Sequence, residues 1–252
     1  MEAKVLQFHK KSDLRVEPKC EHFSVCGGCK WQHIPYEKQL EVKEKHVIDN
    51  LERIAKVELK GFNPILGNEF PYLYRNKLEF TFSNFAWLTD FSKDVDFAER
   101  DMNALGFHVP GMFDRVLIIE NCYLQAEPSN SIRLAVKKYA DEQKLTFFDI
   151  KRHSGLLRNI IIRSSSTGDL MVIVVFYEDD EEKRNALLSF IQTEFPQITS
   201  LMYIINQKPN DSISDQEVIL FTGKDHNMEE MEGIQFKVGP KSFYQTNSPQ
   251  AY

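Results

Sequence analysis

Apolar positions recur with two different periods along this chain. Between Pro35 and Ala55 they fall three, four or seven residues apart, which is the spacing of one helical face. The members of this stripe are Tyr36, Leu40, Val47, Leu51 and Ile54. Proline is well tolerated in the first turn of a helix, so Pro35 suits a helix start. The pattern predicts a helix from Tyr36 to Ala55 whose apolar side requires a partner, and a second copy of the protein is one predicted partner.

Beyond residue 61 the pattern changes to short strands. Residues 77–82 alternate between apolar and polar, as a half-buried strand does, and Thr167-Gly168-Asp169 indicates a hairpin turn. Further strands are predicted at 104–109, 115–119, 157–163, 170–177, 201–206, 217–221 and 234–238, and helices at 130–144 and 179–194. Helices mixed with hairpin-linked strands predict an α+β fold with a mixed, largely antiparallel sheet.

Composition narrows the class of protein. Of the 252 residues, 42% are hydrophobic and 27% are charged, which is typical of a globular protein. No apolar run is long enough to span a bilayer and no secretory leader is evident, so we expect a cytoplasmic protein without a membrane partner. The net charge of −6 gives no general electrostatic support for nucleic-acid binding.

One basic stretch departs from this acidic balance. Residues 151–163 carry four basic residues and no acidic one. Arg152, Arg158 and Arg163 are therefore candidate contacts for RNA phosphates, although a solvated strand edge would look the same. Arg75 and Lys77 are further candidates, with a strand cap as the alternative.

Cysteine spacing points to a metal centre. Cys20, Cys26 and Cys29 lie close together with Gly27-Gly28 between the last two, and Cys122 lies far downstream. Four thiolates suit an iron–sulfur cluster or a structural zinc ion, and glycines leave room for an inorganic ligand. Zinc sites more often use two Cys-x-x-Cys pairs, which favours the cluster; four unligated cysteines remain the third alternative.

The motif Cys-x5-Cys-Gly-Gly-Cys-x-x-Gln resembles the iron–sulfur motif of the bacterial RNA 5-methyluridine methyltransferases. Four further segments follow in the order found in that family: Tyr74-Arg75-Asn76-Lys77, Asn121-Cys122, His153-Ser154-Gly155 with Leu157-Arg158, and Ser242-Phe243-Tyr244-Gln245-Thr246-Asn247. The resemblance implies a 4Fe-4S cluster held by Cys20, Cys26, Cys29 and Cys122. It also implies methyl transfer from S-adenosylmethionine to carbon 5 of a uridine, in ribosomal RNA rather than transfer RNA.

The end of the chain has a specific meaning within this resemblance. Phe243 and Gln245 lie where the methyltransferase domain of the family opens, and the resemblance gives them contacts with the cofactor. We expect a cluster-binding segment and helix (1–60), a central RNA-substrate domain (61–235) and the start of a truncated Rossmann-like catalytic domain (236–252). The nucleophilic cysteine and the base of the reaction are expected outside this sequence, so the fragment itself is predicted to be inactive. A stand-alone metal- or cluster-binding RNA module without enzymatic activity is the alternative, and an electron-transfer protein is a third.

Overall fold

The computed structural model describes residues 6–89 and 101–251, which form two compact units. The first unit comprises Met1–Ser24 and Cys29–Pro71, and the second comprises Val25–Gly28 and Tyr72–Tyr252. Each unit is described by itself.

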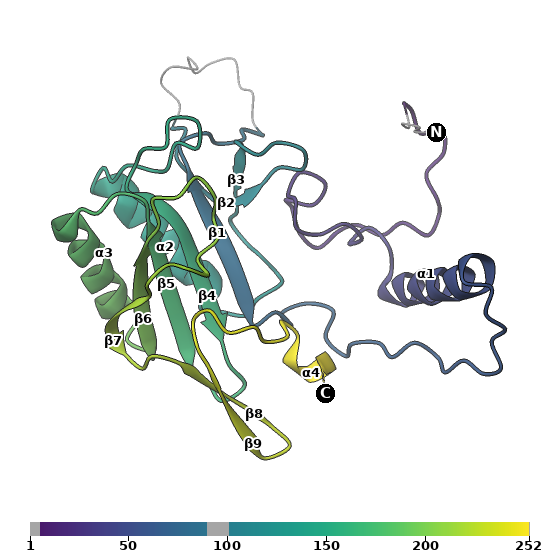
Figure 1. Ribbon diagram of the computed structural model, residues 1–252. Helices are drawn as coiled ribbons and strands as arrows, with labels where there is room; N and C mark the ends of the chain where they lie inside the picture. The colour runs from purple at the N-terminus through teal and green to yellow at the C-terminus, as the bar shows by residue number, and fades with distance from the viewer. Residues whose placement is uncertain (1–5, 90–100, 252) are drawn as a thin grey trace. The chain divides into compact units, whose positions relative to one another are not determined.

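The second unit is built on a seven-stranded sheet in the order β3-β2-β1-β4-β5-β6-β7 (Figure 1). Its strands are β1 (Lys77–Ser83), β2 (Ala104–His108), β3 (Val116–Ile118), β4 (Leu157–Ser164), β5 (Leu170–Phe176), β6 (Ser200–Ile205) and β7 (Ile219–Gly223). Neighbouring strands run antiparallel except β5 and β6, which are parallel. A parallel pair needs a crossover connection, and α3 (Glu181–Glu194) supplies it.

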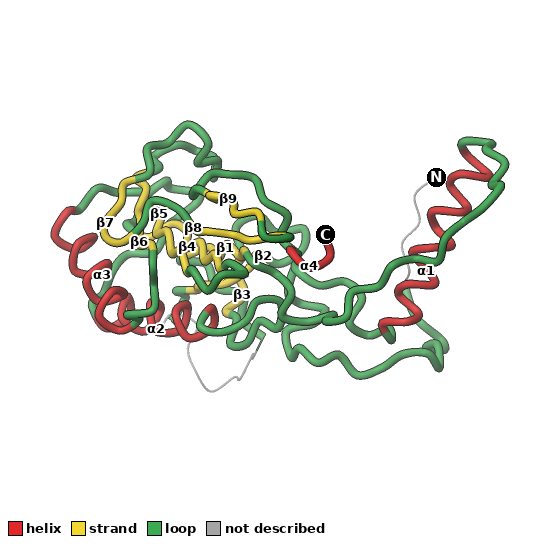
Figure 2. Tube along the Cα trace, turned by 90° about the horizontal axis from the view of Figure 1, so that it is seen from below, coloured by secondary structure: helices red, strands yellow, loops and turns green. Residues whose placement is uncertain are grey.

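Helices α2 (Ser129–Glu142) and α3 cover one face of this sheet (Figure 2). The alternation within β1 and β4 sends Phe80, Phe82, Ile160 and Ile162 toward the helices, where all four are fully buried. Burial of such a side chain stabilises the fold by about 1.5–3 kcal/mol, so this layer is the main core. Asp180 caps α3 by accepting a hydrogen bond from the Lys183 N–H at 3.1 Å.

A smaller apolar cluster lies on the opposite face of β4, β5 and β6. Its buried members are Ile161, Met171, Ile173, Val175, Met202 and Ile204. Ile213 and Val218, from the connection between β6 and β7, pack against them. This connection therefore covers the apolar half of the second face.

A separate hairpin, β8 (Asn227–Met231) with β9 (Ile234–Val238), follows β7 and precedes the short helix α4 (Ser248–Ala251). The buried Glu229 carboxylate fixes the hairpin to the β4–β5 turn, because it accepts hydrogen bonds from the Ser166 N–H at 3.0 Å and from Ser166 Oγ at 2.7 Å. The sequence analysis missed β8, whose Asn-Met-Glu-Glu-Met sequence lacks a clear apolar alternation.

In the first unit, α1 (Tyr36–Asp49) continues into a π-helical turn, η1 (Asn50–Ile54). The chain at 65–68 packs against α1: Tyr36 Oη accepts a hydrogen bond from the Asn68 N–H at 2.6 Å, and a Cβ on Gly67 would lie 2.8 Å from Leu40. The C-terminal part of the stripe is open, with Ile54 77% exposed. The predicted helix is confirmed, and its own unit covers only the first half of its stripe.

Each predicted strand and helix has a counterpart within a few residues, and the mixed, mostly antiparallel fold is confirmed. None of the described helices is both long and apolar enough to cross a membrane.

Candidate functional site

The segment that follows β9 is fastened to the start of β1. Asn76, the buried residue before that strand, donates from its side-chain Nδ2 to Gln245 O and to Ser248 Oγ, both at 2.8 Å. Its backbone N–H donates to Thr246 O at 2.9 Å. Two motifs separated by 169 residues therefore meet, and Asn76 is the residue that joins them.

Arg163 holds the same segment from β4. It is only 4% exposed, and it donates to Gly239 O and to Ser242 O, each at 2.9 Å. Burial lowers the pKa of Arg163, and the neighbouring Glu229 opposes that shift. Arg163 therefore acts on the protein's own backbone and is not an exposed phosphate contact.

The side chains presented by this fastened segment face solvent. Phe243 is 87% exposed and the Gln245 side chain is also exposed, whereas the backbone on both sides of Phe243 is hydrogen-bonded to the sheet. An exposed ring and amide on an ordered backbone are available to a ligand without rearrangement.

Arg158 also differs from its predicted role. It is 1% exposed, it donates to Asn206 O and Lys208 O at 2.7 Å, and it pairs with Asp211 at 2.8 Å. Its guanidinium lies 4.7 Å from the centroid of the Phe148 ring. Arg158 therefore holds the loop after β6 against the sheet, and the predicted surface patch of three arginines is wrong.

Of the predicted RNA contacts, Arg152 is the most exposed, with 85% of its side chain open to solvent. Arg75 and Lys77 are partly exposed, and Arg75 Nε donates to Lys77 O at 3.4 Å. Their predicted contacts with RNA remain predictions.

Two of the four predicted cluster ligands, Cys26 and Cys122, lie in the second unit. Cys26 packs against the core cluster that contains the buried Cys122. The Gly27 N–H donates to His108 O at 3.2 Å, and a Cβ on Gly27 would lie only 2.5 Å from that oxygen. A residue other than glycine at position 27 would therefore push the turn that follows Cys26 away from β2.

The fully buried Arg133 of α2 lies beside Cys122. It donates to Ile119 O at 3.1 Å and to Glu120 O at 2.7 Å, and Asn130 Oδ1 accepts from the Cys122 N–H at 2.9 Å. Burial lowers the pKa of Arg133 to about 10, and the charge of Cys122 opposes this shift. The sequence analysis missed this neighbour, which a lone arginine on the buried face of a predicted helix could have indicated.

The other two ligands, Cys20 and Cys29, lie in the first unit. The Cys20 N–H donates to Gln32 Oε1 at 3.1 Å, which explains why the motif includes a glutamine. Burial raises the pKa of the Cys20 thiol, and the charge of Cys29 contributes to the rise.

The four cysteines are chemically suited to a metal that prefers sulfur ligands. None of the four cysteines forms a disulfide; Cys20 and Cys29 belong to the first unit, and Cys26 and Cys122 belong to the second. Over residues 6–89 and 101–251, however, no group of three or more His, Cys, Asp or Glu side chains is gathered as a metal site. The predicted binding of one metal ion or cluster by all four cysteines stays a prediction.

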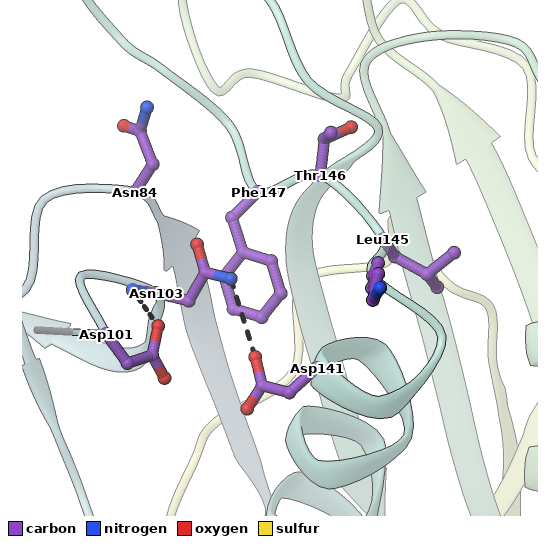
Figure 3. A pocket seen from close by; sticks show the side chains of 8 residues that line it. Asn84, Asp101, Asn103, Asp141, Leu145, Thr146 and Phe147 are labelled. Atoms are coloured by element: carbon purple, nitrogen blue, oxygen red, sulfur yellow. Dashed lines mark hydrogen bonds between the residues drawn. The ribbon is translucent and has the colours of Figure 1, made fainter. Parts of the chain in front are cut away.

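A polar pocket of about 470 Å³ opens beside the end of α2 (Figure 3). Asn103 donates from its side chain to Asp141 at 3.5 Å and from its backbone to Asp101 at 2.9 Å. Lys137 pairs with both carboxylates, at 2.6 Å from Asp141 and 3.4 Å from Asp101. Because both carboxylates are already paired with Lys137, we assign no chemistry to this pocket.

The chain is similar to RNA methyltransferases of several bacteria. It is 56% identical to an uncharacterized RNA methyltransferase of Bacteroides thetaiotaomicron, covering 100% of this chain and 56% of that protein. The identity is 52% to one of Porphyromonas gingivalis and 36% to one of Chlorobaculum tepidum, with 55% and 53% of those proteins covered. The chain thus spans about half the length of the curated relatives it matches. No family model matches it.

A solved structure shares the fold. The tRNA (uracil-54, C5)-methyltransferase of Pyrococcus abyssi, in complex with S-adenosyl-L-homocysteine, superposes with a TM-score of 0.66 at 23% identity. The match covers 97% of this chain and 50% of that one. At this identity the likeness concerns the architecture alone.

Proposed function

We propose, from the similarity of this chain to RNA methyltransferases, that the complete protein transfers a methyl group from S-adenosylmethionine to carbon 5 of a uridine in RNA. One observation carries this proposal. Asn76 holds in place the segment that bears Phe243 and Gln245, through hydrogen bonds to Gln245 O and Ser248 Oγ. The two motifs resemble those of uridine-5 methyltransferases, and the structure joins them at one place.

S-adenosylmethionine, when bound, supplies an electrophilic methyl group. Phe243 and Gln245 are the residues of this chain that would contact it or the target base, since both side chains are exposed on a held backbone. An amide can donate to a carboxylate or a carbonyl and accept from an amine, so Gln245 suits either ligand.

Carbon 5 of uracil is a weak nucleophile, which a thiolate strengthens by adding to carbon 6. A base must then remove the carbon 5 proton before the thiolate leaves. Cys122 does not suit the first role, because it is buried against α2 and its thiol is out of reach of a nucleotide. We assign neither role to a residue of this chain.

The four cysteines are proposed to hold a 4Fe-4S cluster, with a zinc ion as the alternative. Their complete lack of disulfides and the positive charge of Arg133 beside Cys122 support thiolate ligands. Methyl transfer consumes no electron, so the cluster would serve to hold the chain or to position the RNA. Anaerobic purification followed by iron, sulfide and zinc analysis decides between the two, and a Cys26→Ser variant should lose the metal.

Release of tritium tests the reaction itself. Methylation at carbon 5 displaces the hydrogen at that position, so RNA that carries tritium on carbon 5 of uridine should release it in step with methyl incorporation. Ribosomal and transfer RNA should be tested separately, because the preference for ribosomal RNA is a prediction from resemblance. Methyl incorporation without tritium release would place the modification on another atom and overturn the proposal.

A further inference from the structure

We propose that a surface beside the β2–β3 turn binds an unpaired segment of RNA, through one exposed ring and three cations. We call it the Phe113 surface, and its members are Phe113, Arg115, Lys151 and Arg152. The proposal rests on the proposed function, which makes RNA the substrate, and it adds the place and the conformation in which that RNA is held.

The ring is available for stacking. Phe113 lies in the turn between β2 and β3 and is 68% exposed, with the exposed Met112 next to it. Isolated apolar side chains at a surface are common and carry no meaning alone. The surroundings of Phe113 are distinctive because positive charges flank it on both the turn and the neighbouring loop.

Two of these cations are held by one aromatic ring. The Arg115 guanidinium lies 5.3 Å, and the Lys151 ammonium 5.0 Å, from the centroid of Phe85. Lys151 also pairs with Asp114 at 2.5 Å, which ties the loop to the residue that follows Phe113. Arg152, next along the loop, is 85% exposed, and its Nε lies 3.9 Å from Asp149 Oδ2. The Phe113 ring and the cations Arg115, Lys151 and Arg152 therefore belong to one continuous surface.

The loop that carries Lys151 and Arg152 is ordered before any ligand arrives. The buried Asp149 accepts hydrogen bonds from the N–H groups of both residues at 2.9 Å, and from Asn84 Nδ2 at 3.0 Å. A preformed loop loses little conformational entropy on binding. These hydrogen bonds also turn the Asp149 carboxylate inward. The loop therefore presents its basic groups to solvent.

Charge and shape together select the ligand. The protein as a whole carries a net charge of −6, and three carboxylates lie near this surface. Each is paired with a cation: Asp114 with Lys151, Asp149 with Arg152, and Asp211 with the buried Arg158. Arg115 has no carboxylate partner among the ion pairs of the described residues and rests on Phe85. A polyanion with exposed planar groups satisfies both the cations and Phe113. Unpaired RNA has that chemistry, whereas an RNA duplex keeps its bases stacked inside the helix.

Binding of a fluorescent oligouridine to the complete protein, followed by anisotropy, tests this surface. Phe113→Ala should weaken binding about fivefold or more, the loss expected when one stacked base is released, and Phe113→Trp should retain it. Arg152→Ala should lower the slope of log affinity against log salt by about 0.7. Lys138→Ala on α2 and Ile234→Ala on β9 are matched exposed controls that should leave affinity unchanged.

Two further ligands sharpen the result. Heparin carries charge without bases, so Phe113→Ala should leave its binding unchanged, and an RNA duplex should bind more weakly than oligouridine. Equal affinity of wild type and Phe113→Ala for oligouridine overturns the proposal, even if the protein methylates RNA. Conversely, an affinity that depends on Phe113 in a protein that methylates no RNA supports this surface and rejects the proposed function. Thermal melting confirms that each variant is folded.

Discussion

Replacing Asn76 by alanine should release the segment that carries Phe243 and Gln245. The substitution removes two side-chain donors, each 2.8 Å from its acceptor, and leaves the backbone bond to Thr246 in place. A hydrogen bond contributes about 0.5–1.5 kcal/mol net, so the two together contribute about 1–3 kcal/mol. The acceptors, Gln245 O and Ser248 Oγ, belong to the segment that follows the sheet and not to the core. This loss should therefore appear as local opening of that segment and not as global unfolding.

Hydrogen exchange measured by mass spectrometry reads this opening directly. Protection of a peptide covering residues 239–251 should fall by about 5- to 150-fold in Asn76→Ala, the equivalent of that free energy. Asn159→Ala is the matched control, since it removes a buried asparagine of β4 that donates to Thr81 at 3.3 Å. Unchanged protection in Asn76→Ala, or an equal loss in Asn159→Ala, would refute the assignment of Asn76 as the fastening residue. In the complete protein the same variant should bind S-adenosylmethionine more weakly.

Three other substitutions test separate parts of the argument. Gly27→Ala places a Cβ against His108 O and should reduce the metal content of the purified protein, measured by elemental analysis, while the melting temperature changes little. Arg158→Leu leaves buried backbone acceptors unpaired and should lower the free energy of unfolding by on the order of 3 kcal/mol in urea titrations. For Asp169, burial alone would raise the carboxyl pKa, but hydrogen bonds, led by that from the Met228 N–H, lower it below the ordinary 3.8. Its stabilising effect is therefore complete above 3.8 and is lost as the pH falls through the lowered value; Asp169→Asn should flatten that acid limb of the stability curve.

Local periodicity was sufficient for the fold because most strands here pair with near neighbours in the sequence. The β4–β5 hairpin could be predicted from Thr167-Gly168-Asp169, and the glycine adopts the positive φ of 90° that such a turn requires. The parallel pairing of β5 with β6 had no comparable local signal. Strand β8 was missed because it lacks apolar alternation, and the contact of its Glu229 with Ser166, 63 residues away, has no local signal.

The arginines show where sequence reasoning stops. Arg158 and Arg163 are the charged members of a strand that is rich in isoleucine, so their burial was suggested by their neighbours. Their acceptors are backbone carbonyls 48 to 79 residues downstream, and a carbonyl carries no sequence signature. An arginine bound to phosphate and one bound to a distant carbonyl therefore look alike until the chain is folded.

The long separation between Asn76 and Gln245 also fixes the order in which the protein can mature. A ribosome makes the amino-terminal portion first, and contacts distant in sequence form after local ones. The segment bearing Phe243 and Gln245 is synthesised after β1 and β4, and its anchors, Asn76 and Arg163, become usable only once those strands are paired. A nascent chain with an incomplete sheet therefore cannot hold the segment with Phe243 and Gln245 in its ordered form, and that order is acquired only after the sheet has formed.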